Sequence, residues 1–389
     1  MSGLAGLSNH ARDLSPRPEP TSRLPLPSVS RKGPSAASIS SFRRFALATF
    51  PAPRLIPPRL RNRKLIYHTK EQGSGMDSVR EQAEPFRIGL VGIGKIARDQ
   101  HIPAILADPR FVLAATASPH GRIDGVPAYP DIAGMLAGPE KIAAVSLCTP
   151  PAGRVEIARV AIEAGCAVML EKPPAATLAE AAGLVATARA AKISLFATWH
   201  SREAAAVEPA RAWLLGKAVS SVRAAWKEDI RRWHPGQEWI LEDGGFGVFD
   251  PGINALSIIT AVLDSPCTVA QAHLCIPIGR GSPITATLAL RSGTIPVTVD
   301  LDFLQTGPQC WDIVIETDAG RLKLSDGGAT ITIGDGPQSN APNREYPRLY
   351  ARFADLIAEG RSDADLAPLR IVSEALTVGT REIVEAFSF

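Results

Sequence analysis

Apolar and polar positions divide the chain into two regions of different periodicity. From residue 86 to about residue 200, short apolar runs alternate with segments whose apolar residues recur at helical spacing. We predict strands at 86–91, 111–117, 143–148, 167–170 and 194–197, with helices reaching residues 107, 164 and 191. This alternation predicts an α/β domain built on a parallel, doubly wound sheet.

Beyond about residue 200 the chain changes to long segments in which apolar and polar residues alternate. Such alternation is typical of strands in an antiparallel sheet with one buried face. We predict strands at 219–230, 269–276, 284–290, 295–303, 311–317, 321–324 and 329–333, and helices at 203–215, 250–262, 346–358 and 366–386. The expected organisation is a first domain at 86–200, a second α/β domain at 201–345, and final helices at 346–389 that pack back on the first domain.

The first 75 residues have a different composition, rich in Pro, Ser and Arg and poor in acidic residues. We interpret this extension as disordered. A transit peptide has this composition, although the amphipathic helix of such peptides is not evident. The alternative is a mis-annotated extension, with Met76 as the first residue of the protein.

Charge is distributed unevenly along the 389 residues. The chain has 42 Lys and Arg against 39 Asp and Glu, but residues 1–70 contain 13 of the basic residues and only 2 of the acidic ones. The remainder is therefore mildly acidic, and we expect no nucleic-acid surface. No run of 18 apolar residues is present, so we expect no membrane span. Five widely separated cysteines and scattered histidines predict a cytoplasmic protein without disulfides or a metal site.

The first predicted strand leads into a glycine turn, Gly92-Ile93-Gly94-Lys95-Ile96-Ala97. In a strand–turn–helix context, the first glycine permits a tight turn and the second lets the backbone approach a pyrophosphate, which the helix N-terminus attracts. The small side chain of Ala97 still allows close packing of helix on strand. The pattern predicts a dinucleotide site, and the alternative is an ordinary tight turn.

The end of the second strand bears on the choice of cofactor. A site selective for NAD usually has Asp or Glu there to bind the ribose hydroxyls. Residues 116–122 contain none, whereas Ser118, His120 and Arg122 could receive a 2′-phosphate. We therefore predict NADP as cofactor, or tolerance of both NADP and NAD; the alternative is a plain polar turn.

Two further segments contain groups suited to catalysis. Glu171-Lys172-Pro173-Pro174 follows the fourth strand, at the carboxyl edge where doubly wound sheets bind ligands. Asp250 and Asn254 follow a glycine-rich loop and share one face of a predicted helix. We interpret them as a base and a hydroxyl-orienting pair; the alternative is that Asp250 only caps the helix.

Aromatic residues with polar neighbours suggest a sugar as ligand, since a sugar presents C–H patches and a rim of hydroxyls. Five of the six tryptophans lie in or near such positions, and Trp233 in a polar loop is the first candidate. These tryptophans are Trp199, Trp226, Trp233, Trp239 and Trp311.

Together the glycine turn, the Glu171-Lys172-Pro173 motif and the Gly-Gly-x-Gly segment before Asp250 resemble the glucose–fructose oxidoreductase / inositol dehydrogenase superfamily over residues 86–389. Within it, the chain is similar to the aldose 1-dehydrogenases that act on L-arabinose and D-galactose. The resemblance implies a Rossmann domain followed by an α/β domain whose open sheet supports homo-oligomer contacts. It implies sugar contacts from His200, Glu228, Trp233, Asn254 and Trp311. We also assign Thr149, Pro150, Glu171 and Lys172 to cofactor binding.

The activity implied by the resemblance is oxidation of an aldose at C1 to the aldonolactone. Many members of the superfamily have histidine where this chain has Asn254, and an amide cannot accept a proton at neutral pH. The role of base therefore falls on Asp250, with Lys172 holding the substrate oxygen and keeping the aspartate ionised. The alternatives are oxidation of another ring hydroxyl, as in inositol dehydrogenases, and a non-enzymatic sensor of sugar or dinucleotide.

Overall fold

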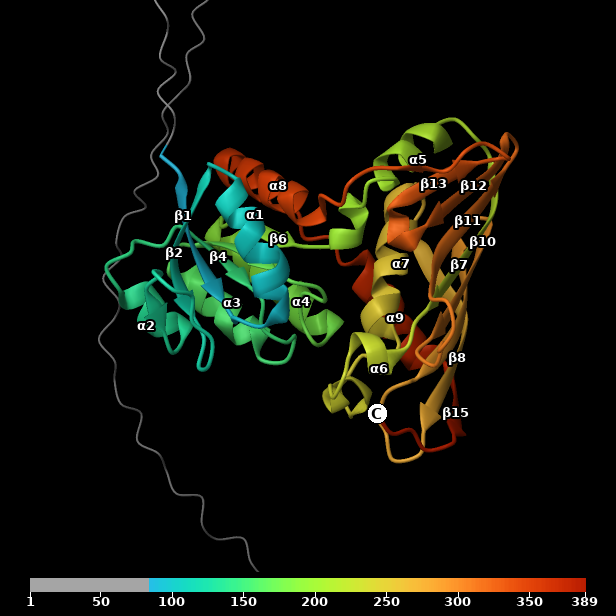
Figure 1. The fold of residues 1–389 in the computed structure, drawn as a ribbon, viewed down its shortest axis with the longest axis horizontal. Helices are drawn as coiled ribbons and strands as arrows, with labels where there is room; N and C mark the ends of the chain where they lie inside the picture. The colour runs from blue at the N-terminus through green and yellow to red at the C-terminus, as the bar shows by residue number, and fades with distance from the viewer. Residues whose placement is uncertain (1–83) are drawn as a thin grey trace, which may run out of the picture. The chain divides into compact units, whose positions relative to one another are not determined.

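The computed structural model describes residues 84–389; the predicted N-terminal extension lies outside them. The first part is a six-stranded parallel sheet in the order β3-β2-β1-β4-β5-β6 (Figure 1). Its strands are β1 (Phe86–Val91), β2 (Phe111–Ala117), β3 (Ala128–Tyr129), β4 (Ala144–Leu147), β5 (Ala167–Leu170) and β6 (Leu195–Ala197). The reversal of strand order beside β1 is that of a doubly wound sheet, so the predicted fold class is confirmed.

Helices connect these strands as the periodicity predicts. They are the π-helix η1 (Ala97–His101), α1 (Ile102–Ala107), α2 (Ile132–Ala137), α3 (Arg154–Glu163) and α4 (Leu178–Ala191). The N-terminus of α4 is held by a reciprocal pair of hydrogen bonds, in which Glu180 N donates to Thr177 Oγ1 and Thr177 N donates to Glu180 Oε2. The short elements β3 and α2 were not among the predicted ones.

The second part is a nine-stranded sheet in the order β14-β13-β12-β11-β7-β10-β9-β8-β15. Only two neighbouring pairs in it, β7 with β10 and β8 with β15, run parallel, so the predicted mostly antiparallel sheet is confirmed. The strands are β7 (Val219–Lys227), β8 (Cys267–Pro277), β9 (Thr285–Ser292), β10 (Ile295–Asp302), β11 (Cys310–Thr317), β12 (Gly320–Ser325), β13 (Thr330–Ile333), β14 (Ser339–Asn340) and β15 (Thr380–Val384).

Helices cover one face of this sheet, with α7 and α9 running along it (Figure 1). The helical elements of this part are η2 (His200–Glu203), α5 (Val207–Leu214), α6 (Ile230–Trp233), η3 (Glu238–Leu241), α7 (Phe249–Val262), η4 (Asp326–Gly328) and α9 (Ala367–Val378). The α7 helix is almost entirely buried, and a Cβ added at Gly252 would lie 2.6 Å from Leu301 Cδ1 of β10. This close approach brings the start of α7 directly against the sheet.

The end of the chain differs from its prediction. Helix α8 (Glu345–Glu359) packs against the parallel sheet, with Tyr350 and Phe353 completely buried in the same core as Phe111. The predicted single helix at 366–386 is wrong, because α9 ends at Val378 and β15 follows as a strand parallel to β8. The β-branched residues of β15 favour this strand. Helix α9 packs on β8 and α7 rather than mainly on the first domain.

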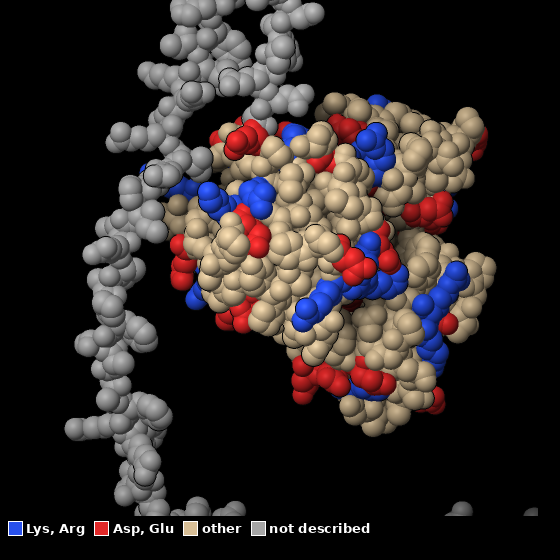
Figure 2. Space-filling view, turned by 60° about the vertical axis from the view of Figure 1, so that its left-hand side comes forward, with Lys and Arg blue, Asp and Glu red and all other residues tan. Residues whose placement is uncertain are grey.

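Charges on the face drawn in Figure 2 are of both signs, with Lys and Arg side chains interspersed among Asp and Glu rather than gathered in one basic patch. Within residues 84–389, no helix is long and apolar enough to cross a membrane.

Candidate functional site

The glycine turn after β1 has the backbone that a dinucleotide site needs. Gly92 has φ +85°, and a Cβ on it would lie 3.0 Å from Thr149 N, so a larger residue is excluded there. A Cβ on Gly94 would meet nothing within 4 Å, which leaves the backbone open to a ligand. Beside the turn, the hydroxyl of Thr149 is buried and has no hydrogen-bond partner within the described residues. An open backbone next to an unpaired hydroxyl fits the phosphates of a dinucleotide.

The other residues of the turn differ in exposure. Ile93 and Ala97 are buried and hold the turn on the core, whereas Lys95 is exposed and pairs with Asp99 one helical turn later. The side chain of Ile96 is partly exposed. Pro150 follows Thr149 at the end of β4, in the adjacent loop.

The polar loop after β2 lies against the same turn. A Cβ on Gly121 would lie 2.5 Å from Ile93 Cβ, so the loop and the turn are in direct contact. Within the loop, Gly121 N donates to Ser118 Oγ at 3.0 Å, and Arg122 O accepts from Arg98 Nη2 at 3.0 Å. The structure therefore places Ser118 and His120 beside the glycine turn, on a loop without a carboxylate between residues 117 and 122.

Glu171, at the end of β5, is bound by groups from three separate segments. Its Oε1 accepts from His101 Nε2 at 2.9 Å and from Tyr346 OH at 2.7 Å, and its Oε2 accepts from Lys172 N at 2.8 Å. The residue is only 5% exposed. Its carboxylate is thus directed into the protein, where it fixes the backbone of Lys172.

His101 links this carboxylate to a wider buried network. Its Nδ1 lies 2.8 Å from Tyr350 OH and 3.2 Å from Ser146 Oγ. Burial alone would lower the pKa of His101, but Cys148, Tyr350 and Glu171 together raise it well above its usual value. Burial alone would raise the pKa of Glu171, but the hydrogen bond and charge of His101 outweigh it and lower the pKa well below the usual range. The two residues therefore form a buried ion pair.

Arg154 binds the main chain around Lys172. Its guanidinium donates to the main-chain oxygens of Glu171, Pro173 and Thr149. The side chain is buried, and this burial lowers the pKa of the guanidinium to about 10. The Lys172–Pro173 peptide bond in the turn is cis. One arginine thus joins the ends of β4 and β5 and fixes the segment that carries Lys172.

Lys172 and Asp250 meet although Lys172 follows β5 of the parallel sheet and Asp250 lies on helix α7, beside the large sheet. Lys172 Nζ donates to the main-chain oxygen of Asp250 at 2.9 Å and lies 3.4 Å from Asp250 Oδ1. Their side chains are 16% and 13% exposed, so both remain accessible to a small ligand. The residue capping α7 is Val248, which leaves Asp250 inside the first turn. The alternative that Asp250 is an N-cap is therefore wrong.

The glycine-rich loop fixes the position of Asp250. Gly247 has φ +54°, and a Cβ on it would collide with the main-chain oxygen of Pro283. Hydrogen bonds from Gly247 N to Ile240 O (2.8 Å) and from Val248 N to Pro283 O (2.7 Å) anchor the loop immediately before α7. Asn254 lies one turn after Asp250 on the same helix and is partly buried.

A second cluster joins Glu228 to two aromatic rings. Trp311 Nε1 donates to Glu228 Oε2 at 2.8 Å, and His234 Nε2 lies 3.4 Å from Glu228 Oε1. Trp233 packs edge-on against Trp311 with ring centroids 5.4 Å apart, and remains 45% exposed. An acid and an exposed ring side by side are suited to a sugar, although no hydrogen bond among the described residues joins this cluster to Lys172 or Asp250.

His200 lies in a third cluster. Its Nδ1 is 2.6 Å from Glu345 Oε2, and its ring stacks on Tyr346, which itself donates to Glu171. Among the remaining tryptophans, Trp199 and Trp226 are buried in the core and Trp239 is exposed. The residues absent from the sequence prediction are His101, Arg154, Glu345, Tyr346 and Tyr350. The only feature of the sequence that could have indicated them was a polar or aromatic side chain within a predicted helix.

Comparisons with known proteins agree with this arrangement. The sequence profile of the Gfo/Idh/MocA family, described as an oxidoreductase family with an NAD-binding Rossmann fold, matches residues 86–198. Galactose 1-dehydrogenase from Pseudomonas fluorescens is 41% identical over 305 residues, which cover 78% of this chain and 99% of the relative. The crystal structure of D-galactose-1-dehydrogenase from Rhizobium etli is 50% identical, with a TM-score of 0.77 over 79% of this chain and 99% of the other.

A more distant structure shares the fold alone. A 3-ketoreductase from Actinomadura kijaniata, crystallised with NADP and TDP-benzene, is 18% identical with a TM-score of 0.65, over 78% of this chain and all (100%) of the other. The resemblance inferred from the sequence motifs is confirmed by the more similar relatives.

The buried ion pair predicts a dependence of stability on pH. Since the folded state raises the pKa of His101, its contribution to the free energy of unfolding is complete below about pH 6.5 and declines as the pH rises toward the folded pKa. His101→Gln should remove that decline. Urea unfolding at about pH 6 and about pH 9 measures it, with the exposed His120→Gln as control. Equal pH dependence in wild type and His101→Gln would contradict the ion pair.

The loop before α7 predicts different costs for two glycine substitutions. Gly244→Ala replaces a glycine with φ +81° in open space, so it should cost only about 1–2 kcal/mol of backbone strain. Gly247→Ala adds the collision with Pro283 and should cost at least about 1 kcal/mol more. Urea unfolding of both variants measures the difference. Equal losses would show that Pro283 does not restrict this loop.

Proposed function

Because this chain belongs to the Gfo/Idh/MocA family of oxidoreductases with an NAD-binding Rossmann fold, we propose that it oxidises D-galactose, L-arabinose or both at C1 to the aldonolactone. The two most similar proteins described above are both named as galactose 1-dehydrogenases. The observation that carries the proposal is the contact of Lys172 Nζ with Asp250, which places an ammonium group and a carboxylate together at the carboxyl edge of the parallel sheet.

The residues around the glycine turn would hold the dinucleotide. The backbone of residues 92–97 would face the pyrophosphate, with the Thr149 hydroxyl and Pro150 beside it. Ser118 and His120 would receive a 2′-phosphate, so we propose NADP as the preferred cofactor, with NAD also accepted. When bound, the nicotinamide supplies the hydride acceptor, and the protein supplies orientation and electrostatics.

Asp250 is the proposed general base. Of its two carboxylate oxygens, Oδ1 faces Lys172, and Oδ2 has no hydrogen-bond partner among residues 84–389. The Oδ2 atom can therefore accept the proton of the C1 hydroxyl. The position of Asp250 in the first turn of α7 favours its negative charge, because the helix N-terminus carries a partial positive charge.

Lys172 is the proposed partner of that base. Its ammonium group has three N–H donors, and the two contacts with Asp250 leave one for the substrate oxygen. That hydrogen bond would hold the C1 oxygen and stabilise the charge that develops there as its proton leaves. The backbone of Lys172 is fixed by Glu171, which acts as a positioning residue.

Hydroxyl recognition is assigned to the polar and aromatic residues. Glu228 and Asn254 would bind ring hydroxyls, and Trp233 and Trp311 would cover the C–H face of the sugar. His200 would add a further contact. A site built to bond one hydroxyl strongly rejects sugars that lack or misplace it, and D-galactose and L-arabinose share their ring hydroxyl arrangement.

The domain roles and assembly follow the same proposal. Residues 86–200 bind the cofactor, residues 201–345 bind the sugar and form homo-oligomer contacts through the large sheet, and residues 346–389 complete both parts. The proposed compartment is the cytoplasm, because the cysteines at five separate positions are all free thiols.

Initial rates on a panel of sugars test the substrate and the cofactor. D-galactose and L-arabinose should be oxidised faster than D-glucose, D-xylose or myo-inositol, with the lactone as product and a higher kcat/KM for NADP than for NAD. Activity on myo-inositol alone would assign the reaction to another ring hydroxyl. No activity on any of the five, in protein shown to bind NADP, would favour a sensor.

Substitution of Asp250 tests the mechanism. Asp250→Ala and Asp250→Asn should lower kcat by about 10²–10⁴, because both remove the general base. Asp264→Ala, which changes an exposed aspartate just beyond the other end of α7, is the matched control and should leave kcat unchanged. A loss below about tenfold, with an unchanged KM for galactose, would exclude Asp250 as the base.

A further inference from the structure

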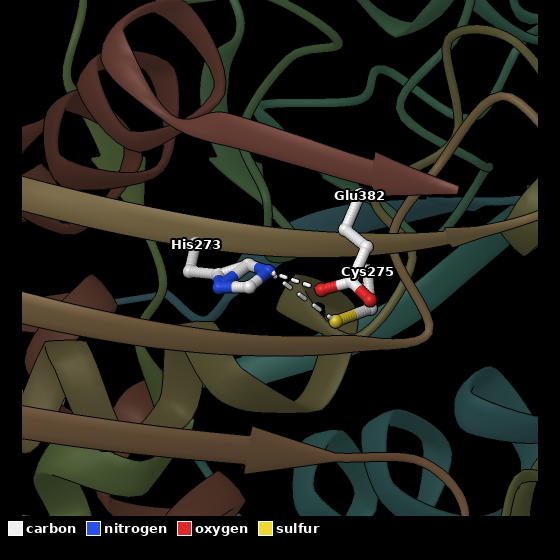
Figure 3. Close-up of side chains that lie close together, drawn as sticks. All are labelled: His273, Cys275 and Glu382. Carbon is white, nitrogen blue, oxygen red and sulfur yellow. Dashed lines mark hydrogen bonds and ion pairs between the residues drawn. The ribbon is translucent and has the colours of Figure 1, made fainter. Parts of the chain in front are cut away.

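Three side chains with metal-binding chemistry converge on the large sheet, away from Lys172 and Asp250. His273 and Cys275 lie on β8, and Glu382 lies on β15 (Figure 3). Figure 3 shows the imidazole, the thiol and the carboxylate directed toward one another. Their nitrogen, sulfur and oxygen atoms all lie within 4.8 Å of one another, the only such group among residues 84–389.

The register of the two strands creates this convergence. In the parallel pair, Cys275 is opposite Glu382, and His273 lies two residues before Cys275. Residues two apart in a strand share a face, so all three side chains leave the same side of the sheet. The intervening Leu274 is buried on the opposite face. The shared face is therefore set by the backbone, and the side-chain rotamers set the distances between the three groups.

The distances between the three groups suit a metal ion. His273 Nε2 is 2.9 Å from Glu382 Oε2 and 3.8 Å from Cys275 Sγ. Tetrahedral zinc, with bonds of about 2.0–2.3 Å, places its ligand atoms about 3–4 Å apart. Small rotations of the three side chains would complete that geometry.

We propose that His273, Cys275 and Glu382 form a binding site for a Zn²⁺-type cation. Imidazole, thiolate and carboxylate are the three ligand types that zinc accepts, and a set containing a thiolate disfavours Mg²⁺ and Ca²⁺. Three protein ligands leave the fourth tetrahedral position for water.

The basic side chain nearest in sequence to the three ligands is directed away from them. The basic residue nearest in sequence, Arg381, alternates to the other face of β15 and donates to Leu376 O. In the single chain His273 and Glu382 are exposed and Cys275 is partly buried, so all three can be reached by an ion before any assembly of chains. The site joins the final strand β15 to β8, and bound metal would fasten this edge of the sheet.

Metal titration of the full chain, purified without a histidine tag, tests the site. Calorimetry with Zn²⁺ should show one saturable site per chain, and Co²⁺ should give the near-ultraviolet absorption of a cobalt–thiolate bond. Cys275→Ser should abolish that absorption. His273→Ala and Glu382→Gln should each weaken Zn²⁺ binding by at least about tenfold.

The control is Cys310→Ser, which removes a partly buried thiol on β11 of the same sheet and should leave the titration unchanged. Substitutions at exposed positions usually change stability little. Urea unfolding midpoints measured without metal verify that each variant is folded. The proposal is overturned if wild type shows no saturable Zn²⁺ binding and no cobalt–thiolate absorption. It is also overturned if all three ligand variants bind Zn²⁺ as tightly as wild type. The titration measures metal binding and not galactose oxidation, so its result is separate from the test of the proposed function.

Discussion

A buried ion pair between His101 and Glu171, together with the guanidinium of Arg154, controls the architecture around the site. Charges taken out of water need good partners, and removing one partner of a buried pair typically costs about 3–5 kcal/mol. Here each charge is partnered, because Glu171 accepts from His101, Tyr346 and Lys172 N, and Arg154 donates to three main-chain oxygens. This network fixes the main chain of the segment that contains Lys172.

The same network explains why a late helix packs on the first sheet. Tyr346 and Tyr350 of α8 bring hydroxyls to Glu171 and His101, while Phe353 fills the apolar core beside them. A helix from the end of the chain thus supplies polar partners that the first domain lacks. The position of Lys172 therefore depends on contacts with residues far away in sequence.

The position of Asp250 depends on close packing rather than on charge. A glycine at 247 allows the chain to pass the main-chain oxygen of Pro283, and Gly252 lets α7 approach Leu301. These contacts bring Asp250 to Lys172 Nζ. The large sheet therefore supports the helix that carries Asp250, and its adjacent edge strands β8 and β15 bring together a separate set of polar side chains.

The sequence by itself determined the local elements: the glycine turn, the capped helix α4, the alternation of strands and helices in the first domain and the family resemblance all follow from patterns within short windows. It also identified Lys172 and Asp250, because each lies in a distinctive motif. Only the tertiary structure decided that Lys172 Nζ contacts both the main-chain oxygen and the carboxylate of Asp250, that Glu171 faces His101, and that strand β15 follows α9. Local periodicity records which face of an element is buried, whereas these pairings depend on packing between segments far apart in the chain.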